Sequence, residues 1–392
     1  MATIAFVLLP ETGHINSGFK LAKSLMLRGH RVCYLGLKEF EPVVRGQGVE
    51  FISLFEGLYD RGEIPVQASR PSALRNFDLF QSLLMASTSD HSPSNIARII
   101  SEEVSKVVER IRPDLFLIDS LLQDFALIIT MMGLPGALLH TLLYNDLADD
   151  DEIYKPIHAL PELVLWPKEF DFPRRAQEAR RFYYLEAAVD LERDEQPFPW
   201  ERISKDKLLI YCSLGSQSHL YAESIPFFQT AIDAMVSRPD WQMILSVGHH
   251  LKESDFHGIP PNVMFVNSVP QLSVLRRADM MITHGGINSI KECIFLGVPM
   301  IILPVSGDQP MNAARIEYHG LGIRGNLRKA TVERIQALVS KIEQNPSYKT
   351  RIEAMRQRFL EVESSGVGAR VIEEIIQKST TPAKQCAELV AV

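Results

Sequence analysis

The chain alternates short apolar runs with amphipathic stretches, a pattern typical of β-strands that lead into α-helices. In the first half, helical patterns such as residues 15–28 and 96–111 separate the apolar runs. The strands that we expect there are Ile4–Leu9, Arg31–Leu35, Val49–Leu54, Leu115–Ile118 and Ala137–Leu139. This alternation predicts a doubly wound parallel sheet.

The second half shows the same alternation. Its expected strands are Leu208–Cys212, Gln242–Ser246, Val263–Val266, Met280–Thr283 and Met300–Leu303. Three helical segments follow residue 331, and the last of them covers residues 368–377. The pattern therefore predicts an α/β protein with two Rossmann-like doubly wound parallel-sheet domains, although the two halves share no sequence repeat.

A proline-rich stretch, from Gln196-Pro197-Phe198-Pro199-Trp200 to Lys207, separates the halves and is interpreted as an interdomain linker. The predicted organisation is a first domain over residues 1–195, a linker over 196–207, a second domain over 208–365, a C-terminal helix over 366–378 and a polar tail over 379–392. Residues 60–93 and 144–182 lose the helical and strand periods, and long excursions of this kind are typical of functional loops.

Charge and cysteine content restrict the function. The chain has 41 basic and 48 acidic residues, a net charge of −7 and a pI near 5.9, which argues against a role that depends on neutralising nucleic-acid phosphates. The four cysteines are far apart without a CxxC pair, as expected of free thiols.

The hydropathy pattern contains no segment typical of secretion or of a membrane span. The chain enters its first strand without the basic flank and cleavage site of a signal peptide. The longest apolar run, Phe125–Leu139, is too short for a span and is broken by Gly133-Leu134-Pro135-Gly136. We expect a cytoplasmic protein, with peripheral membrane contact left open.

The most informative stretch, residues 279–313, has the order strand, tight turn, helix, strand and loop. Gly285-Gly286 allows a sharp turn between the strand and a helix from Asn288 to Leu296. The N-terminus of such a helix presents free N–H groups and a partial positive charge. His284, Asn288 and Ser289 add side-chain donors, so the stretch predicts a phosphate-binding site.

Acidic and amide side chains extend this site. Glu292 lies one helical turn after Asn288, where its carboxylate could accept hydrogen bonds from a ribose diol. Asp308 and Gln309 form a polar pair in the loop after the next strand. Together these residues suit a diphosphate flanked by a ribose and by another polyhydroxyl group.

The segment from His284 to Gln309 resembles the signature of the family 1 glycosyltransferases, which join a His-Gly-Gly turn, Asn-Ser, a Glu, Gly-Val-Pro and an Asp-Gln pair. The resemblance implies a GT-B fold and an inverting enzyme. Such an enzyme moves a hexose from a nucleoside diphosphate sugar to a hydroxyl of a lipophilic small molecule. UDP-glucose is favoured as the donor, with a dTDP-sugar possible, and the resemblance implies no metal and no further cofactor.

The resemblance also implies roles for the donor-binding residues. In the family, the loop matched by Ser216 touches the diphosphate, and the segment matched by Val269 and Gln271 surrounds the base and ribose. His284, Gly286, Asn288 and Ser289 would hold the diphosphate, Glu292 the ribose, and Asp308 with Gln309 the sugar hydroxyls. Ser268 stands where family members often have an aromatic residue, which leaves the nucleobase open.

His14 lies in the turn after the first strand, at the start of a predicted helix. A helix N-terminus disfavours the imidazolium, so we expect a pKa near 6.5 or below and a neutral ring that can serve as a general base. The alternative is a structural, hydrogen-bonded histidine. The resemblance favours the base, since family members carry it in a Gly-His turn matched by Gly13-His14.

The family orients this histidine with an aspartate at the end of a later strand, which Asp119 matches. Asp119 would accept the ring N–H and stabilise the imidazolium. Asp124 is the rival candidate, and without the resemblance Asp119 could equally be an N-cap.

Three other patterns could indicate a metal site or a P-loop, but each fits that interpretation poorly. Asp149-Asp150-Asp151-Glu152 contains an Asp-x-Asp, but it does not end a strand and is interpreted as a solvated acidic loop. His249, His250 and His257 lack the spacing of a zinc site. Residues 13–18 mimic the glycine spacing of a P-loop without its lysine. Two alternatives keep the fold, a nucleotide-sugar epimerase and a non-catalytic partner protein that binds the nucleotide sugar.

Overall fold

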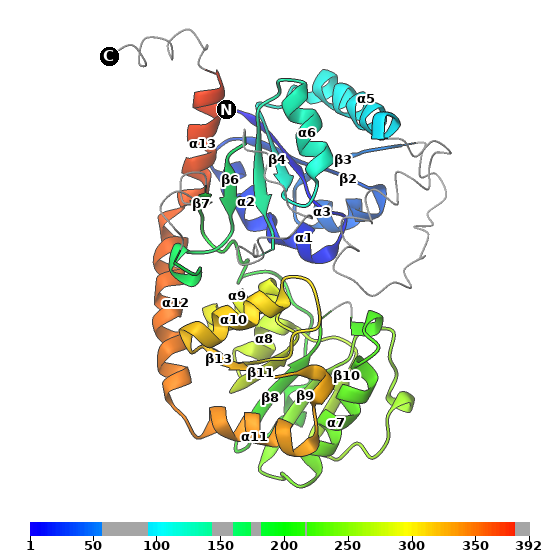
Figure 1. The fold of residues 1–392 in the computed structure, drawn as a ribbon, viewed down its shortest axis with the longest axis vertical. Helices are drawn as coiled ribbons and strands as arrows, with labels where there is room; N and C mark the ends of the chain where they lie inside the picture. The colour runs from blue at the N-terminus through cyan, green and yellow to red at the C-terminus, as the bar shows by residue number, and fades with distance from the viewer. Residues whose placement is uncertain (57–92, 143–159, 174–181, 216–217, 381–392) are drawn as a thin grey trace.

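The computed structural model describes residues 1–56, 93–142, 160–173, 182–215 and 218–380, and it contains two parallel β-sheets, one in each half of the chain (Figure 1). The first sheet has the strand order β3-β2-β1-β4-β5-β6-β7. Its strands are β1 (Thr3–Val7), β2 (Arg31–Gly36), β3 (Glu50–Ser53), β4 (Leu115–Asp119), β5 (Gly136–His140), β6 (Glu162–Val164) and β7 (Phe182–Tyr184). The central strands are buried on both faces, as expected of a sheet covered by helices on each side.

The helices of the first domain follow its strands. They are α1 (Thr12–Ser17), α2 (Phe19–Leu27), α3 (Glu41–Gly46), α5 (Pro93–Ile111) and α6 (Gln123–Met131). The single helix predicted over residues 15–28 is wrong, because the chain is divided at Gly18. A Cβ atom at Gly18 would lie 2.5 Å from the Tyr34 hydroxyl, so only glycine allows this close passage over β2.

The second sheet has the order β10-β9-β8-β11-β12-β13. Its strands are β8 (Leu208–Ser213), β9 (Trp241–Ser246), β10 (Val263–Val266), β11 (Met280–Thr283), β12 (Met300–Ile302) and β13 (Gly322–Arg324). Its helices are α7 (Ser224–Val236), α8 (Gln271–Leu275), α9 (Ile287–Leu296), α10 (Gln309–His319) and α11 (Val332–Glu343). The two parallel sheets confirm the predicted fold class.

Single-turn 3₁₀ helices occupy several connections in the described part of the chain. They are η1 (Lys38–Phe40), η2 (Lys168–Phe170), η3 (Trp200–Arg202), η4 (Ser218–Leu220), η5 (Glu253–Asp255) and η6 (Leu327–Lys329). The sequence pattern missed β6, β7 and β13, because each has only three residues and shows no period of its own.

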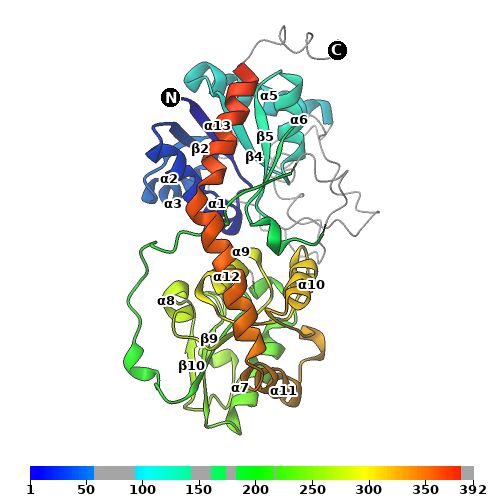
Figure 2. The same ribbon diagram turned by 90° about the vertical axis from the view of Figure 1, so that its left-hand side faces the viewer.

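Two long helices connect the domains (Figure 2). α12 (Ser347–Ser365) packs against α9 of the second domain, and α13 (Val367–Thr380) packs against α2 of the first. Gly366, in the left-handed conformation with φ 57°, forms the joint between them. Ile372 and Ile375 of α13 enter the apolar core that lies on the α2 side of the first sheet.

A buried ion pair joins the first domain to α10. Asp171 Oδ1 accepts from Arg315 Nη2 at 2.8 Å and from Nε at 3.1 Å, and both side chains are about 1% exposed. Tyr184 Oη donates to the other carboxylate oxygen at 2.9 Å. Because a buried charge that loses its partner is strongly destabilising, the pair resists separation of the two domains at this point.

None of the helices in the described residues is both long and apolar enough to cross a bilayer. Cys33, Cys212 and Cys293 are buried free thiols, in agreement with the expectation from their spacing.

Lys291 of α9 is a buried amine at the domain interface. It is 1% exposed, and its Nζ has no hydrogen-bond partner among the described residues. The Trp166 ring lies beside it, with 6.0 Å between Nζ and the ring centroid. Burial lowers the pKa of Lys291 from 10.5 to about 7, while the Glu363 carboxylate opposes the change.

This pKa predicts a stability that rises with pH. Between pH 7 and 10.5 the unfolded chain binds one more proton at Lys291 than the folded chain, so the free energy of unfolding should increase by up to about 1.4 kcal/mol per pH unit. Lys291→Met should be more stable than the wild type at pH 7 and should lose this slope in urea unfolding measured at pH 7, 8 and 9. Substituting the exposed Lys205 by Met is the control, and a slope that survives in Lys291→Met would contradict the assignment.

Candidate active site

The first domain places polar side chains where its strand order reverses. β1 lies between β2 and β4. From β1 the chain continues to β2 and β3 on one side, and it then crosses back to β4 on the other side of β1. His14 follows β1 and Asp119 ends β4, which puts both at the carboxyl edge of neighbouring strands. Open α/β sheets bind ligands at such a point.

His14 and Asp119 form a buried pair. His14 Nδ1 lies 2.7 Å from Asp119 Oδ2, the His14 side chain is 4% exposed and Asp119 is fully buried. Since an ionised carboxylate only accepts hydrogen bonds, Nδ1 carries the proton and Nε2 is left as the basic nitrogen. Asp119, and not its rival Asp124, is therefore the partner that fixes the tautomer.

Thr141 is a third member of this group, which the sequence did not predict. Its hydroxyl donates to Asp119 Oδ2 at 2.9 Å and lies 2.7 Å from His14 Nδ1. Thr141 directly follows β5, the strand next to β4. A polar residue at that strand end was therefore the available signal.

Backbone N–H groups also hold the Asp119 carboxylate. Leu121 N–H donates to Oδ1 at 3.1 Å and Leu9 N–H to Oδ2 at 3.4 Å. Burial raises the pKa of Asp119, but the His14 charge and hydrogen bond, together with the Leu121 and Thr141 hydrogen bonds, lower it below its usual value. The carboxylate is thus kept charged beside the imidazole.

The expectation of a pKa near 6.5 or below for His14 is wrong. Burial lowers the pKa of His14, but the charge and hydrogen bond of Asp119 outweigh burial, with smaller contributions from Glu11 and Asp308, and the pKa is raised. The sequence argument weighed the helix N-terminus and omitted the carboxylate in contact.

The second domain repeats the arrangement with different chemistry. β8 lies between β9 and β11, and the turns after β8 and β11 bring Gly215 and His284 together. A Cβ at Gly215 would lie 2.6 Å from His284 Cε1, and one at Gly286 would lie 2.8 Å from Nε2. The imidazole fits between these two glycines because neither has a side chain. Ser216 lies outside the described residues.

Burial lowers the pKa of His284 to about 4, so the ring is neutral at physiological pH. His284 therefore supplies no positive charge beside the helix N-terminus. A neutral imidazole can still donate one N–H to a ligand.

The N-terminus of α9 contacts the Gly13-His14 turn of the other domain. Asn288 Nδ2 donates to the backbone carbonyl of Gly13 at 2.9 Å. Gly286 is the N-cap, and Ser289 Oγ accepts from Gln271 Nε2 at 3.3 Å. The predicted phosphate site thus lies next to His14.

Both oxygens of Glu292 have protein partners. Oε1 accepts from Arg193 Nη1 at 2.6 Å, and Oε2 accepts from Gln271 Nε2 at 2.8 Å. Gln271 Oε1 in turn accepts from the Tyr211 hydroxyl at 3.0 Å. Val269 is half-buried and packs on the core beneath this network. The sequence did not point to Arg193.

Asp308 and Gln309 organise the loop after β12. Gln309 Oε1 accepts from the backbone N–H groups of Val305 at 2.8 Å and Ser306 at 3.1 Å. Asp308 Oδ2 accepts from Asn312 Nδ2 at 2.8 Å, and the same amide donates to the carbonyl of Gly285. The loop is therefore tied to the Gly285-Gly286 turn.

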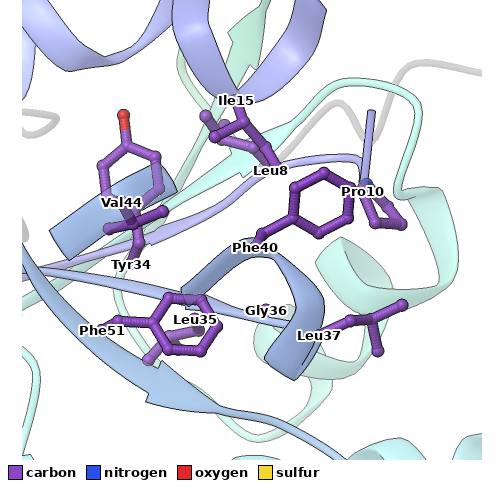
Figure 3. Close-up of a pocket in the computed structure, with 10 residues that line it drawn as sticks. All are labelled: Leu8, Pro10, Ile15, Tyr34, Leu35, Gly36, Leu37, Phe40, Val44 and Phe51. Carbon is purple, nitrogen blue, oxygen red and sulfur yellow. The ribbon is translucent and has the colours of Figure 1, made fainter. Parts of the chain in front are cut away.

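A small apolar pocket lies beside the segment from Pro10 to Ile15 in the first domain (Figure 3). It is lined by Leu8, Pro10, Ile15, Tyr34, Leu35, Gly36, Leu37, Phe40, Val44 and Phe51. Ile15, which follows His14 in α1, is one of the lining residues. Residues 60–92 and 144–159, which include Asp149–Glu152, are outside the described part of the chain.

Comparison with known proteins identifies relatives of this architecture. The family model described as UDP-glucoronosyl and UDP-glucosyl transferase matches residues 242–359. NDP-glycosyltransferase YjiC from Bacillus subtilis (strain 168) is 26% identical over 405 residues, which are 97% of this chain and 98% of the relative.

Two solved structures show the same fold. The glycotransferase of kitacinnamycin superposes with a TM-score of 0.76 at 24% identity, covering 96% of this chain and 99% of its own. The spinosyn rhamnosyltransferase SpnG, complexed with thymidine diphosphate, has a TM-score of 0.68 at 16% identity, covering 92% and 96%.

Two facing parallel-sheet domains with ligand-binding edges define the class of GT-B proteins. Within that class, the chain resembles the family 1 glycosyltransferases, because the segment from His284 to Gln309 carries their signature and the matched relatives are glycosyltransferases.

The hydrogen bonds of Thr141 predict that removing its hydroxyl lowers activity without changing the packing. Thr141→Val keeps the volume and removes the hydroxyl, so the Asp119 carboxylate loses one hydrogen bond of a kind worth about 1.5–3 kcal/mol. We expect kcat/KM for glycosyl transfer to fall at least about tenfold, with the affinity for the nucleotide unchanged in calorimetry. Full activity in the variant would remove Thr141 from the group.

The raised pKa of His14 predicts the acid limb of the pH profile. Neutral His14 is the active form, so kcat/KM should fall as the pH drops through a value above 6.5. Asp119→Asn removes the charge that raises this pKa, so the limb should move to lower pH while kcat/KM at pH 8 falls on the order of 10²–10⁴-fold. A limb that stays in place would show that another group titrates.

Proposed function

We propose that this protein is an inverting glycosyltransferase that moves a hexose from a nucleoside diphosphate sugar to a hydroxyl of a lipophilic small molecule. The observation that carries the proposal is the 2.9 Å hydrogen bond from Asn288 to the carbonyl of Gly13. It brings the N-terminus of α9, suited to a diphosphate, beside a histidine that is already paired with a carboxylate. A base on one domain and a leaving-group site on the other, joined by this contact, suit transfer between two bound substrates.

In the proposed reaction, His14 Nε2 takes the proton of the acceptor hydroxyl. The acceptor oxygen bonds to the anomeric carbon as the bond from that carbon to the diphosphate oxygen breaks, and attack from the opposite side inverts the configuration. Asp119 stabilises the imidazolium that forms, and Thr141 holds the carboxylate. General-base catalysis of this kind contributes about 10²–10⁴-fold.

The second domain stabilises the negative charge of the departing diphosphate. The N–H groups at the start of α9, with Asn288, Ser289, Gly286 and neutral His284, offer donors there, and Ser216 is assigned the same role from the sequence. The proposal gives this task to the protein alone, without a metal ion or a further cofactor.

The donor is assigned to UDP- or dTDP-sugars. Gln309 next to Asp308 favours a glucose-type sugar, and Glu292 is positioned for the ribose. The solved relative SpnG in complex with thymidine diphosphate supports dTDP as the second candidate. Ser268 is exposed where an aromatic residue would stack on the base, so the base is not gripped there as in many family members.

The acceptor is assigned to lipophilic natural products such as polyketides, phenolics or terpenoids. The similar structures named for kitacinnamycin and spinosyn belong to enzymes of natural products, which supports the same class.

His14→Ala separates catalysis from donor binding and tests the proposal. Because His14 lies in the first domain, transfer should fall at least about 10²-fold while UDP or dTDP binding stays within about twofold in calorimetry. Transfer is followed by mass spectrometry with UDP- and dTDP-sugars and mixed aglycones, and the exposed His249→Ala is the control.

Other outcomes favour the alternatives. Collapse of nucleotide binding in His14→Ala would contradict the division of labour between the domains. Conversion of the donor sugar without an acceptor would indicate an epimerase. Nucleotide-sugar binding by the wild type without any turnover would indicate a non-catalytic partner protein.

A further inference from the structure

Arg193 reaches the donor half from the segment that joins the two domains. Its Nη1 donates to Glu292 Oε1 at 2.6 Å, and its Nη2 lies 3.7 Å from Glu195 Oε1. Glu195 accepts from the backbone N–H groups of Leu272 and Ser273, each at 2.8 Å, and from the Ser273 hydroxyl at 2.7 Å. The joining segment is therefore fixed to the start of α8, and Glu292 and Glu195 hold the Arg193 guanidinium between them.

The Glu292 side chain is 6% exposed, so its acceptor sites can be counted. A carboxylate has about four lone-pair sites, two on each oxygen. Arg193 fills one site on Oε1, and Gln271 fills one on Oε2. One site remains on each oxygen, which matches the two hydroxyls of a ribose diol.

A nucleoside diphosphate brings no cation that could replace the guanidinium. If the nucleotide displaced Arg193, a buried carboxylate would lose its only positively charged partner within hydrogen-bonding distance among the described residues, which is strongly unfavourable. The nucleotide therefore binds in addition to Arg193, and the guanidinium sets the direction of the sites that stay free.

We propose that Arg193 is a positioning residue for the donor, which orients Glu292 so that its two free acceptor sites face the 2′- and 3′-hydroxyls of the ribose. This inference rests on the proposed function, because it takes Glu292 as the ribose ligand. It extends that function by naming the residue, outside the family signature, on which recognition of the 2′-hydroxyl depends.

Two matched ligand pairs test this role, each differing only in the 2′-hydroxyl. They are UDP with 2′-deoxyUDP, and 5-methylUDP with dTDP, titrated by calorimetry into the full chain. With the wild type, the ribose member of a pair should bind about tenfold more tightly, as expected for one hydrogen bond to a charged acceptor.

Arg193→Ala should weaken the ribose nucleotide about tenfold and the deoxyribose nucleotide less than about threefold, so the preference within the pair disappears. Arg193→Lys keeps the positive charge and should restore binding to within about threefold of the wild type. Arg276→Ala is the matched control, because Arg276 Nη2 donates to the carbonyl of Leu191 in the same segment without contacting Glu292. It should leave both affinities unchanged.

The possible failures are distinguishable. Wild-type affinity for the ribose nucleotide in Arg193→Ala, or equal weakening of both members of a pair, would overturn the role of Arg193. A preference that survives in Glu292→Ala would instead remove Glu292 from the ribose, and no binding of either pair to the wild type would overturn the donor class itself. Thermal unfolding of each variant separates these results from loss of folding.

Discussion

The hydrogen bond between Asp119 and His14 is the interaction on which the proposed chemistry of this protein depends. Water cannot hydrate the charge of an imidazolium that is only 4% exposed, so burial alone would hold the pKa of His14 low. The carboxylate reverses that effect and leaves only Nε2 free to take a proton. Thr141 and the N–H of Leu121 fill other acceptor sites of the carboxylate, so the pair has one geometry. The strand-order reversal between β1 and β4 makes this meeting possible, because it opens the carboxyl edge of the sheet at that point.

The two domains are held in register by charges as well as by apolar packing. Trp166 and Phe170 of the first domain pack in one core with Phe295 and Phe359 of the second, and the Asp171–Arg315 pair lies at the same boundary. Such a pair contributes less to stability than its distance suggests, because both groups lose hydration. Its geometry is directional, however, and an apolar contact of the same area would allow the domains to slide. A fixed orientation is what a site divided between two domains requires.

Much of this fold follows from local pattern, whereas several contacts of the site do not. The strands Val263–Val266 and Met280–Thr283 were predicted at their observed limits, because each is an apolar run bounded by polar residues. The places of His14 and Asp119 after two strands left a structural histidine and an N-cap as alternatives, and the resemblance to the family 1 glycosyltransferases was needed to predict that the two residues pair. The role of Arg193 could not be predicted, and that of Thr141 was signalled only by a polar residue at a strand end, because their partners lie 99 and 127 residues away and no local period records such distances. The break at Gly18 depends in the same way on the Tyr34 hydroxyl.

The neutrality of His284 follows from how tightly the second domain is built around it. Gly215 and Gly286 bring backbone so close to the ring that added Cβ atoms would collide with it, and this enclosure leaves the ring only partly exposed to the water that an imidazolium would need. The proposed reaction requires stabilisation of the leaving diphosphate oxygen more than of the intact donor. A neutral N–H donor beside the start of α9 gives directional stabilisation to the charge that develops on the leaving oxygen. The same enclosure therefore explains why glycine is required at both positions and why the site relies on oriented dipoles.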